Sequence, residues 1–152
     1  MKTINKTIVT LGVALGLASG GAMAQGFDQG DLYLGGGINF NSVSGRSDTT
    51  GFQLFGGYKL RMLDIEQLNF AAELGYMDSG RFDGAWINGL VGVPLSESFQ
   101  FMGRAGIDLG DDDGLMFGIG AAYALTRDVE FRVEYVVRDR TNSTQINAAY
   151  HF

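Results

Sequence analysis

Apolar residues recur at every second position along most of the chain after residue 30. This is the period of a β-strand whose two faces meet different surroundings, and clusters of turn residues separate the alternating stretches. The pattern predicts eight strands of about 9 to 11 residues, a length that crosses a bilayer when the strand is tilted and exceeds that of most globular strands. The predicted strands are residues 31–40, 50–60, 69–77, 84–95, 99–109, 114–125, 129–138 and 143–152.

The two faces of these strands differ in charge. One face is apolar throughout, as at Leu54, Val91 and Ile119, and the other carries the charged residues together with many glycines, such as Gly75 and Gly118. A soluble barrel would show the same alternation with its faces reversed, so alternation alone leaves both arrangements open. Glycines on the charged face favour a narrow, enclosed interior filled by side chains, because they make room for large neighbours.

Aromatic residues on the apolar face are sorted by height along the predicted strands. Alternating the strand direction places them in two rings, as expected for girdles at the two membrane interfaces. One ring contains Tyr58, Phe70, Phe99, Tyr123, Phe131, Tyr150 and Phe152, and the other contains Phe40, Phe52, Tyr76, Phe117 and Tyr135. An open sheet edge in hydrocarbon leaves backbone groups unpaired. The predicted fold is therefore all-β, an eight-stranded antiparallel up-and-down transmembrane barrel with short turns and loops.

The charged face predicts a network of ion pairs inside the barrel. Its members are Asp31, Lys59, Glu73, Arg104, Asp108, Glu130, Arg132, Glu134 and Arg138. A buried charge without a partner is costly, so we expect Glu73, Arg104, Arg132 and Glu134 to pair centrally and Asp108 to lie near Arg138. The network is interpreted as a static polar plug. The alternative is a gate whose pairs exchange to admit ions.

The first 24 residues have the features of a cleaved secretory signal. Lys2 and Lys6 precede a short apolar segment, and a small-residue pattern ends at Ala24. Residues 25–152 are then a single barrel domain, and losing the two lysines lowers the formal charge from −6 to −8. This acidic balance argues against nucleic-acid binding. With no cysteine in the chain, disulfides, thiol chemistry and cysteine metal sites are excluded.

Several segments together resemble the OmpA/OmpX-type family of small outer-membrane barrels. They are Gly75-Tyr76, residues 103–106, residues 118–123, residues 132–135, and the C-terminal pattern Ile146, Ala148, Tyr150 and Phe152. The resemblance implies a Gram-negative outer membrane with both chain ends periplasmic. It also implies that the C-terminal pattern is read by the barrel assembly machinery, and that the partners are membrane lipid and lipopolysaccharide around a monomer. The chain differs from full-length OmpA in lacking a periplasmic domain, and from adhesin-like relatives in its short outer loops.

Enzymatic and metal sites find little support in the sequence. His151 is the single histidine and has no serine or aspartate at a catalytic spacing, so we expect no enzyme activity. Asp108 and residues 111–113 lack the ligand spacing of a calcium loop and are interpreted as a solvated turn, with a divalent cation as the alternative. No cofactor is expected.

These features predict a structural or surface-interaction role for a barrel with a closed lumen. The alternatives are a small ion or solute channel, a surface adhesin or resistance factor, and, more remotely, a soluble periplasmic ligand-binding barrel. Conductance separates the channel from the closed barrel, and membrane fractionation separates the membrane barrels from the soluble one.

Overall fold

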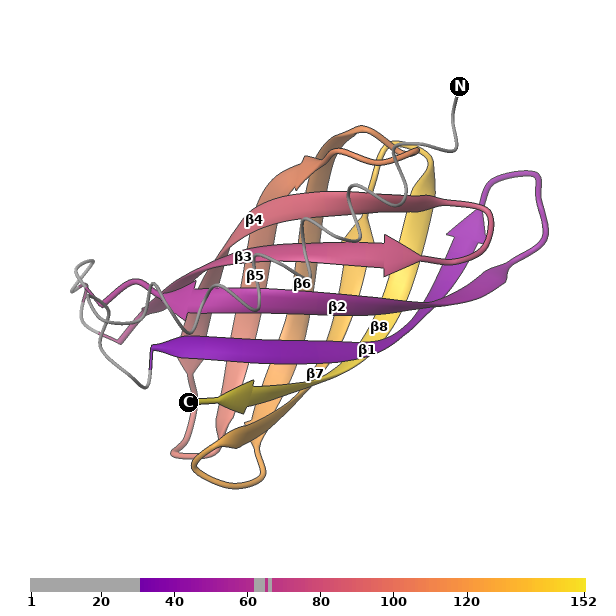
Figure 1. Ribbon diagram of the computed structural model, residues 1–152. Coiled ribbons are helices and arrows are strands. Elements are labelled where there is room, and N and C mark those ends of the chain that lie inside the picture. The colour runs from indigo at the N-terminus through magenta and orange to yellow at the C-terminus, as the bar shows by residue number, and fades with distance from the viewer. Residues whose placement is uncertain (1–30, 62–64, 66) are drawn as a thin grey trace.

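The computed structural model describes residues 31–61, 65 and 67–152. Within them the chain forms one closed antiparallel barrel in which each strand pairs with its neighbours in sequence and β1 pairs with β8 (Figure 1). The predicted fold class is thereby confirmed. The predicted signal segment, residues 1–24, lies outside the described residues.

The eight strands follow one another with short connections. Their bounds are β1 Leu32–Val43, β2 Thr49–Lys59, β3 Asn69–Asp78, β4 Asp83–Pro94, β5 Phe99–Asp108, β6 Gly114–Ala124, β7 Val129–Val137 and β8 Thr141–His151. β1 begins and β8 ends at the same rim, which also carries the β2–β3, β4–β5 and β6–β7 connections (Figure 1). We call this end the turn rim and the opposite end the loop rim.

Strand ends differ from the prediction mainly where β1 meets β8. β1 continues three residues beyond Phe40, and β8 begins two residues before Ser143, with Val43 opposite Thr141 in the register. The prediction was wrong here because it followed apolar alternation, whereas backbone pairing continues through polar residues such as Asn41 and Ser42. The other six strands agree with the prediction to within one residue at each end.

The two faces of the wall are sorted as the sequence predicts. Large apolar side chains such as Leu54, Phe101 and Ile119 point outward and are exposed, whereas the charged side chains of the lumen are buried. In β8 the alternation is strict from Thr141 to Tyr150. The β1 and β8 strands, which meet at the closing seam, contain no aspartate, glutamate, lysine or arginine. The charges of the lumen centre therefore come from other strands.

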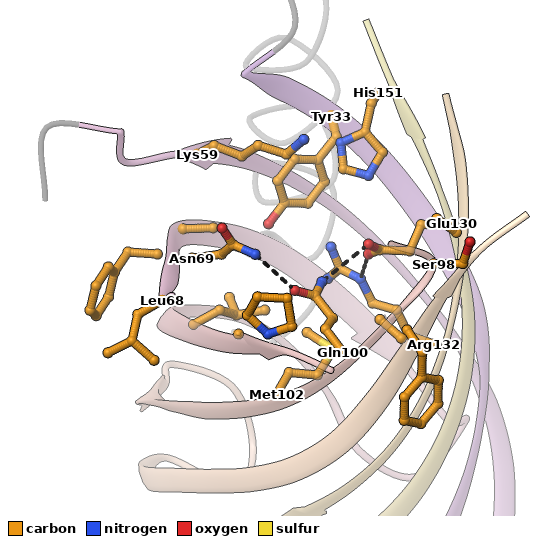
Figure 2. A pocket seen from close by; sticks show the side chains of 18 of the residues that line it. Tyr33, Lys59, Leu68, Asn69, Ser98, Gln100, Met102, Glu130, Arg132 and His151 are labelled. Atoms are coloured by element: carbon orange, nitrogen blue, oxygen red, sulfur yellow. Dashed lines mark hydrogen bonds and ion pairs between the residues drawn. The ribbon is translucent and has the colours of Figure 1, made fainter. Parts of the chain in front are cut away.

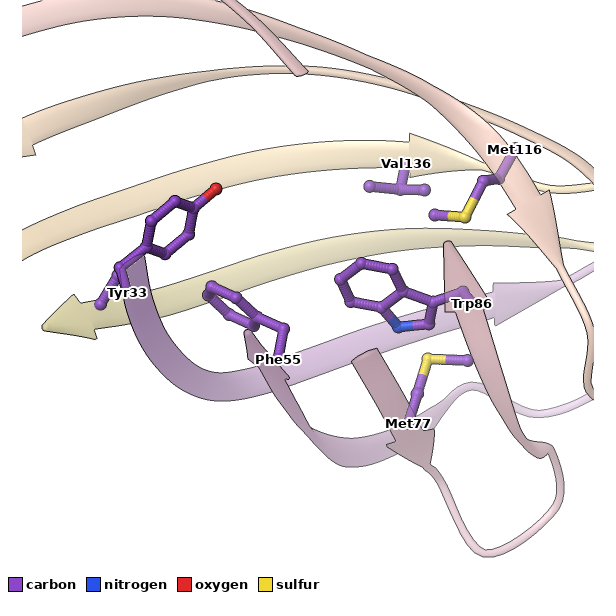
Figure 3. Close-up of a cluster of buried hydrophobic side chains, with 7 residues drawn as sticks. Tyr33, Phe55, Met77, Trp86, Met116 and Val136 are labelled. Atoms are coloured by element: carbon purple, nitrogen blue, oxygen red, sulfur yellow. The ribbon is translucent and has the colours of Figure 1, made fainter. Parts of the chain in front are cut away.

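Apolar side chains also fill much of the lumen, which the sequence analysis did not predict. A buried cluster runs along the interior and contains Tyr33, Phe55, Met77, Trp86, Met116, Val136 and Ala149 (Figure 3). Gly57 lies beneath the Tyr33 ring and Gly75 beneath the Trp86 ring, where a Cβ atom would overlap the ring atoms. A second, smaller cluster of Leu90, Met102 and Ala122 lies closer to the turn rim.

No helix in the described part of the chain is long and apolar enough to cross a membrane.

Candidate functional site

Three strands place charged side chains at the centre of the lumen. Glu73 lies on β3, Arg104 on β5, and Arg132 and Glu134 on β7. Each stands at an inward position of its strand, and all four side chains are at most 4% exposed. The structure thus brings together the four residues that the sequence placed at the centre.

Arg104 links the two central glutamates. Its Nη2 donates to both carboxylate oxygens of Glu134, at 2.6 and 2.9 Å, and to Oε2 of Glu73 at 3.4 Å. Glu73 Oε1 accepts from Arg132 Nη1 and, at 2.8 Å, from the Tyr33 hydroxyl. Each buried carboxylate therefore has a guanidinium partner as well as a further donor, the arrangement that makes burial of such charges tolerable.

The network continues from the centre to the turn rim. Arg132 Nε donates to Glu130 Oε1 at 2.6 Å, and Gln100 Nε2 donates to Glu130 Oε2 at 3.3 Å (Figure 2). Asn69 Nδ2 in turn donates to Gln100 Oε1 at 3.2 Å. The dashed contacts in Figure 2 mark this part of the network, which ends at an exposed asparagine.

Neutral amides extend the same network toward the loop rim. Asn147 Nδ2 donates to Glu134 Oε2 at 2.9 Å, and Gln53 Nε2 donates to Asn147 Oδ1 at 2.7 Å and to Gln145 Oε1 at 3.0 Å. An unbroken series of side-chain contacts therefore runs from Asn69 to Gln145 and joins five strands through the lumen, and the Tyr33 hydroxyl adds β1 as a sixth. Such linkage fixes the positions of side chains that a passing ion would have to displace.

Aromatic rings cover the faces of the two central arginines. The Arg104 guanidinium lies 5.5 Å from the centre of the Trp86 ring, and that of Arg132 lies 5.0 Å from the Tyr33 ring and 5.5 Å from the Phe55 ring. Cation–π attraction at these distances adds to the ion pairs. The apolar cluster and the ionic network thus share an interface instead of forming separate layers.

A separate pair lies toward the loop rim. Arg138 Nε donates to Asp108 Oδ2 at 2.8 Å, as the sequence predicts, and Asp108 also accepts from the Gly110 backbone at 2.9 Å. Asp112 accepts from the backbone of Arg140 at 3.1 Å. In the described residues no group of three or more histidine, cysteine or acidic side chains is arranged to hold a metal.

The turn rim carries a pair that the sequence analysis missed. Arg61 Nε donates to Asp31, although Arg61 lies two residues beyond the end of β2 and outside the predicted strands. Lys59, which was predicted to pair, forms no ion pair with any described residue. With Arg61 added, the predicted network contains five basic and five acidic residues. The available signal in the sequence was that Arg61 directly follows the predicted strand 50–60.

A cavity of about 530 Å³ opens at the turn rim, and we call it the vestibule. Tyr33, Lys59 and His151 lie along one side of it, and Leu68 and Met102 lie on the opposite side (Figure 2). Arg132 and Glu130 also line it. The vestibule therefore ends at the ionic network.

His151 is packed against an aromatic ring. Its imidazole centre lies 4.9 Å from that of Tyr33, and its Nδ1 is buried without a hydrogen-bond partner among the described residues. No serine or acidic side chain is hydrogen-bonded to it there, so the contacts do not form a catalytic dyad.

The predicted aromatic girdles and C-terminal pattern face outward. None of the girdle residues is buried, and Tyr150 and Phe152 contact each other edge to face with ring centres 5.3 Å apart. Ile146, Ala148 and Tyr150 are exposed on β8, and Phe152 follows that strand with its backbone N–H donating to Leu32 at 3.0 Å. Recognition of this pattern by the assembly machinery stays a prediction.

Comparisons with known proteins agree with this geometry. The family described as outer membrane protein beta-barrel domain matches residues 10–152. A de novo designed transmembrane β-barrel covers 82% of this chain and 98% of its own, with 19% identity and a TM-score of 0.59. Ail, the attachment invasion locus protein of Yersinia pestis, covers 80% and 96%, with 12% identity and a TM-score of 0.55.

Neisserial surface protein A covers 80% of this chain and 97% of its own, with 15% identity and a TM-score of 0.52. These identities are low, so the structural likenesses speak for the fold alone. No curated protein matches the chain by sequence.

Proposed function

Because the chain belongs to the outer membrane protein β-barrel domain family, we propose that it is an integral outer-membrane protein with a structural or surface-interaction role and a lumen plugged by its own side chains. Family membership places it in the outer membrane of a Gram-negative bacterium. The observation that carries the closed lumen is the network from Asn69 to Gln145, whose central carboxylates are buried and each paired with a guanidinium.

Physical reasoning supports a plug over a pore. A permeating ion would have to separate Arg104 from Glu134 or Arg132 from Glu73, and each separation leaves an unpaired charge in a buried setting. The Tyr33, Phe55 and Trp86 rings fill space beside these pairs. An eight-stranded barrel has an interior that side chains can fill, in contrast to the wide porins.

The wider assignment follows the same reasoning. We propose a monomer surrounded by lipid and lipopolysaccharide, assembled by the barrel assembly machinery, without nucleic-acid partners and without enzyme activity. The short connections at the loop rim offer little surface for an adhesin. Ail shares the fold at 12% identity, and that likeness carries no adhesive function to this chain.

Conductance measurements test the closed lumen. Purified wild-type barrel in a planar bilayer should give no current steps, and the Arg104→Ala variant should also be silent if the plug is static. The Arg127→Ala variant, in an exposed turn, is the control for the substitution itself. Regular steps from the wild type would favour the channel, and steps confined to Arg104→Ala would favour the gate.

Cysteine labelling tests the proposed orientation, with both chain ends and the turn rim in the periplasm. The chain has no cysteine, so single variants give an unambiguous signal. On intact cells an impermeant maleimide should label Ser47→Cys, between β1 and β2, but not Glu97→Cys, between β4 and β5. Disruption of the outer membrane should make both positions reactive, and the reverse pattern on intact cells would contradict the orientation.

A further inference from the structure

We propose that the vestibule at the turn rim binds an amphipathic monocarboxylate. The carboxylate would lie at Lys59, and the hydrocarbon part would lie against Leu90, Met102 and Ala122. This inference goes beyond the structural role and does not depend on whether the lumen conducts.

One side of the vestibule carries a positively charged lysine. Lys59 is half-buried there and forms no ion pair with a described residue. The two carboxylates that act on Lys59 already have arginine partners, since Asp31 pairs with Arg61 and Glu130 with Arg132. An anion at Lys59 would therefore gain a charge-assisted contact that no described residue makes.

The other side of the vestibule is apolar and continuous with Lys59. In the strand register Lys59 lies opposite Ala71, and Ala71 lies opposite Leu90. Ala71 packs against the buried cluster of Leu90, Met102 and Ala122. Adjacent strands are about 4.8 Å apart, so β2 and β5 are separated by roughly 14 Å along the wall, a span that suits a short hydrocarbon chain.

The size and electrostatics of the vestibule restrict the ligand class. A volume of about 530 Å³ falls within the range typical of small-molecule sites. Glu97 and Glu130 also line the cavity and would repel a second negative charge, which disfavours dianions and phosphates. Arg132, deeper in the lumen, is already paired with Glu73, so we expect the carboxylate of the ligand to stay at the rim. A monoanion with one apolar end is the class that satisfies both sides.

Methionine methyl groups provide a direct readout. Met102 lines the vestibule, whereas Met77 and Met116 belong to the other interior cluster and serve as internal references. The barrel, labelled with ¹³C at its methionine methyls, is placed in lipid nanodiscs and titrated with octanoate. We expect a saturable shift of the Met102 signal with the Met77 and Met116 signals unchanged.

Charge variants separate binding at Lys59 from general partitioning into lipid. Lys59→Gln should weaken octanoate binding about tenfold, as for loss of one charged hydrogen bond, whereas Lys59→Arg should retain most of it. Arg127→Gln removes a charge near the same rim but outside the vestibule, and should bind as the wild type does. Neutral octanamide should bind at least several-fold more weakly than octanoate.

Three results would overturn the proposal. They are the absence of a saturable Met102 shift, an unchanged affinity in Lys59→Gln, and equal responses to octanoate and octanamide. The electrophoretic shift of the folded barrel on boiling shows that each variant is folded, so a missing response cannot be assigned to unfolding.

Discussion

Two neighbouring positions at one height of the wall, Arg104 and Ile119, have opposite surroundings. Arg104 lies opposite Gly118 and Gly103 opposite Ile119, so the two residues are one strand spacing and one residue apart. Counting backbone and side chain together, Arg104 is 5% exposed and Ile119 is 71% exposed. The direction of the side chain alone decides whether a charge or a hydrocarbon is suitable. The charged side of this wall is the enclosed one, the reverse of a soluble barrel.

Removing the inward charge should have the largest effect. Arg104→Leu leaves Glu134 and Glu73 without their shared guanidinium, so we expect the free energy of unfolding to fall by about 3 to 5 kcal/mol. Urea unfolding in lipid vesicles measures this, with the fluorescence of Trp86, the single tryptophan, as the signal.

The matched control for this variant is Arg127→Leu in an exposed turn, which should change stability by less than about 0.5 kcal/mol. If Arg104→Leu were as stable as this control, the buried network would not contribute in the way its contacts indicate.

Adding a charge to the outward side should be the next most damaging change. Ile119 is the middle residue of β6, and Ile119→Arg puts a guanidinium where hydrocarbon is expected. The expected loss is about 2 to 4 kcal/mol in lipid vesicles. Ile119→Leu is the size control and should be nearly neutral. Equal stability of Ile119→Arg and Ile119→Leu would argue that this face does not meet lipid.

The smallest effect is expected at the exposed end of the same network. Asn69→Ala removes one neutral hydrogen bond to Gln100, where water can replace it, so a loss below about 1 kcal/mol is expected. The same urea experiment gives the value. A loss as large as that of Arg104→Leu would show that the contribution of these contacts to stability does not depend on their depth in the lumen.

Much of the fold was predictable because the residue types of each strand alternate between its two faces. In β8 inward Gln145 and Asn147 alternate with outward Ile146 and Ala148, so the sequence alone distinguishes lumen from lipid. The central partners could be placed as well, because Glu73, Arg104 and Glu134 all stand at inward positions at similar depth.

The rest depends on quantities that alternation does not carry. Met116 and Val136 share the inward positions with the charges, but they were overlooked because filling a lumen is a matter of volume and not of polarity. The pairing of Arg61 with Asp31 was not predicted because Arg61 lies beyond the last residue of a strand, where the direction of the side chain depends on the conformation of the connection. Lys59 likewise has no ion pair with a described residue, because Asp31 pairs with Arg61 and Glu130 pairs with Arg132.

The composition of the closing seam has a consequence for biogenesis. The first and last strands of the described barrel meet through glycines, amides and hydroxyl groups, and carry no formally charged aspartate, glutamate, lysine or arginine. The central ion pairs join β3, β5 and β7, so they can form before the two ends of the sheet come together. Closing the seam thus moves no charged side chain of β1 or β8 out of water, and Tyr33 and Asn147 from these strands then supply hydrogen bonds to Glu73 and Glu134 in place of water.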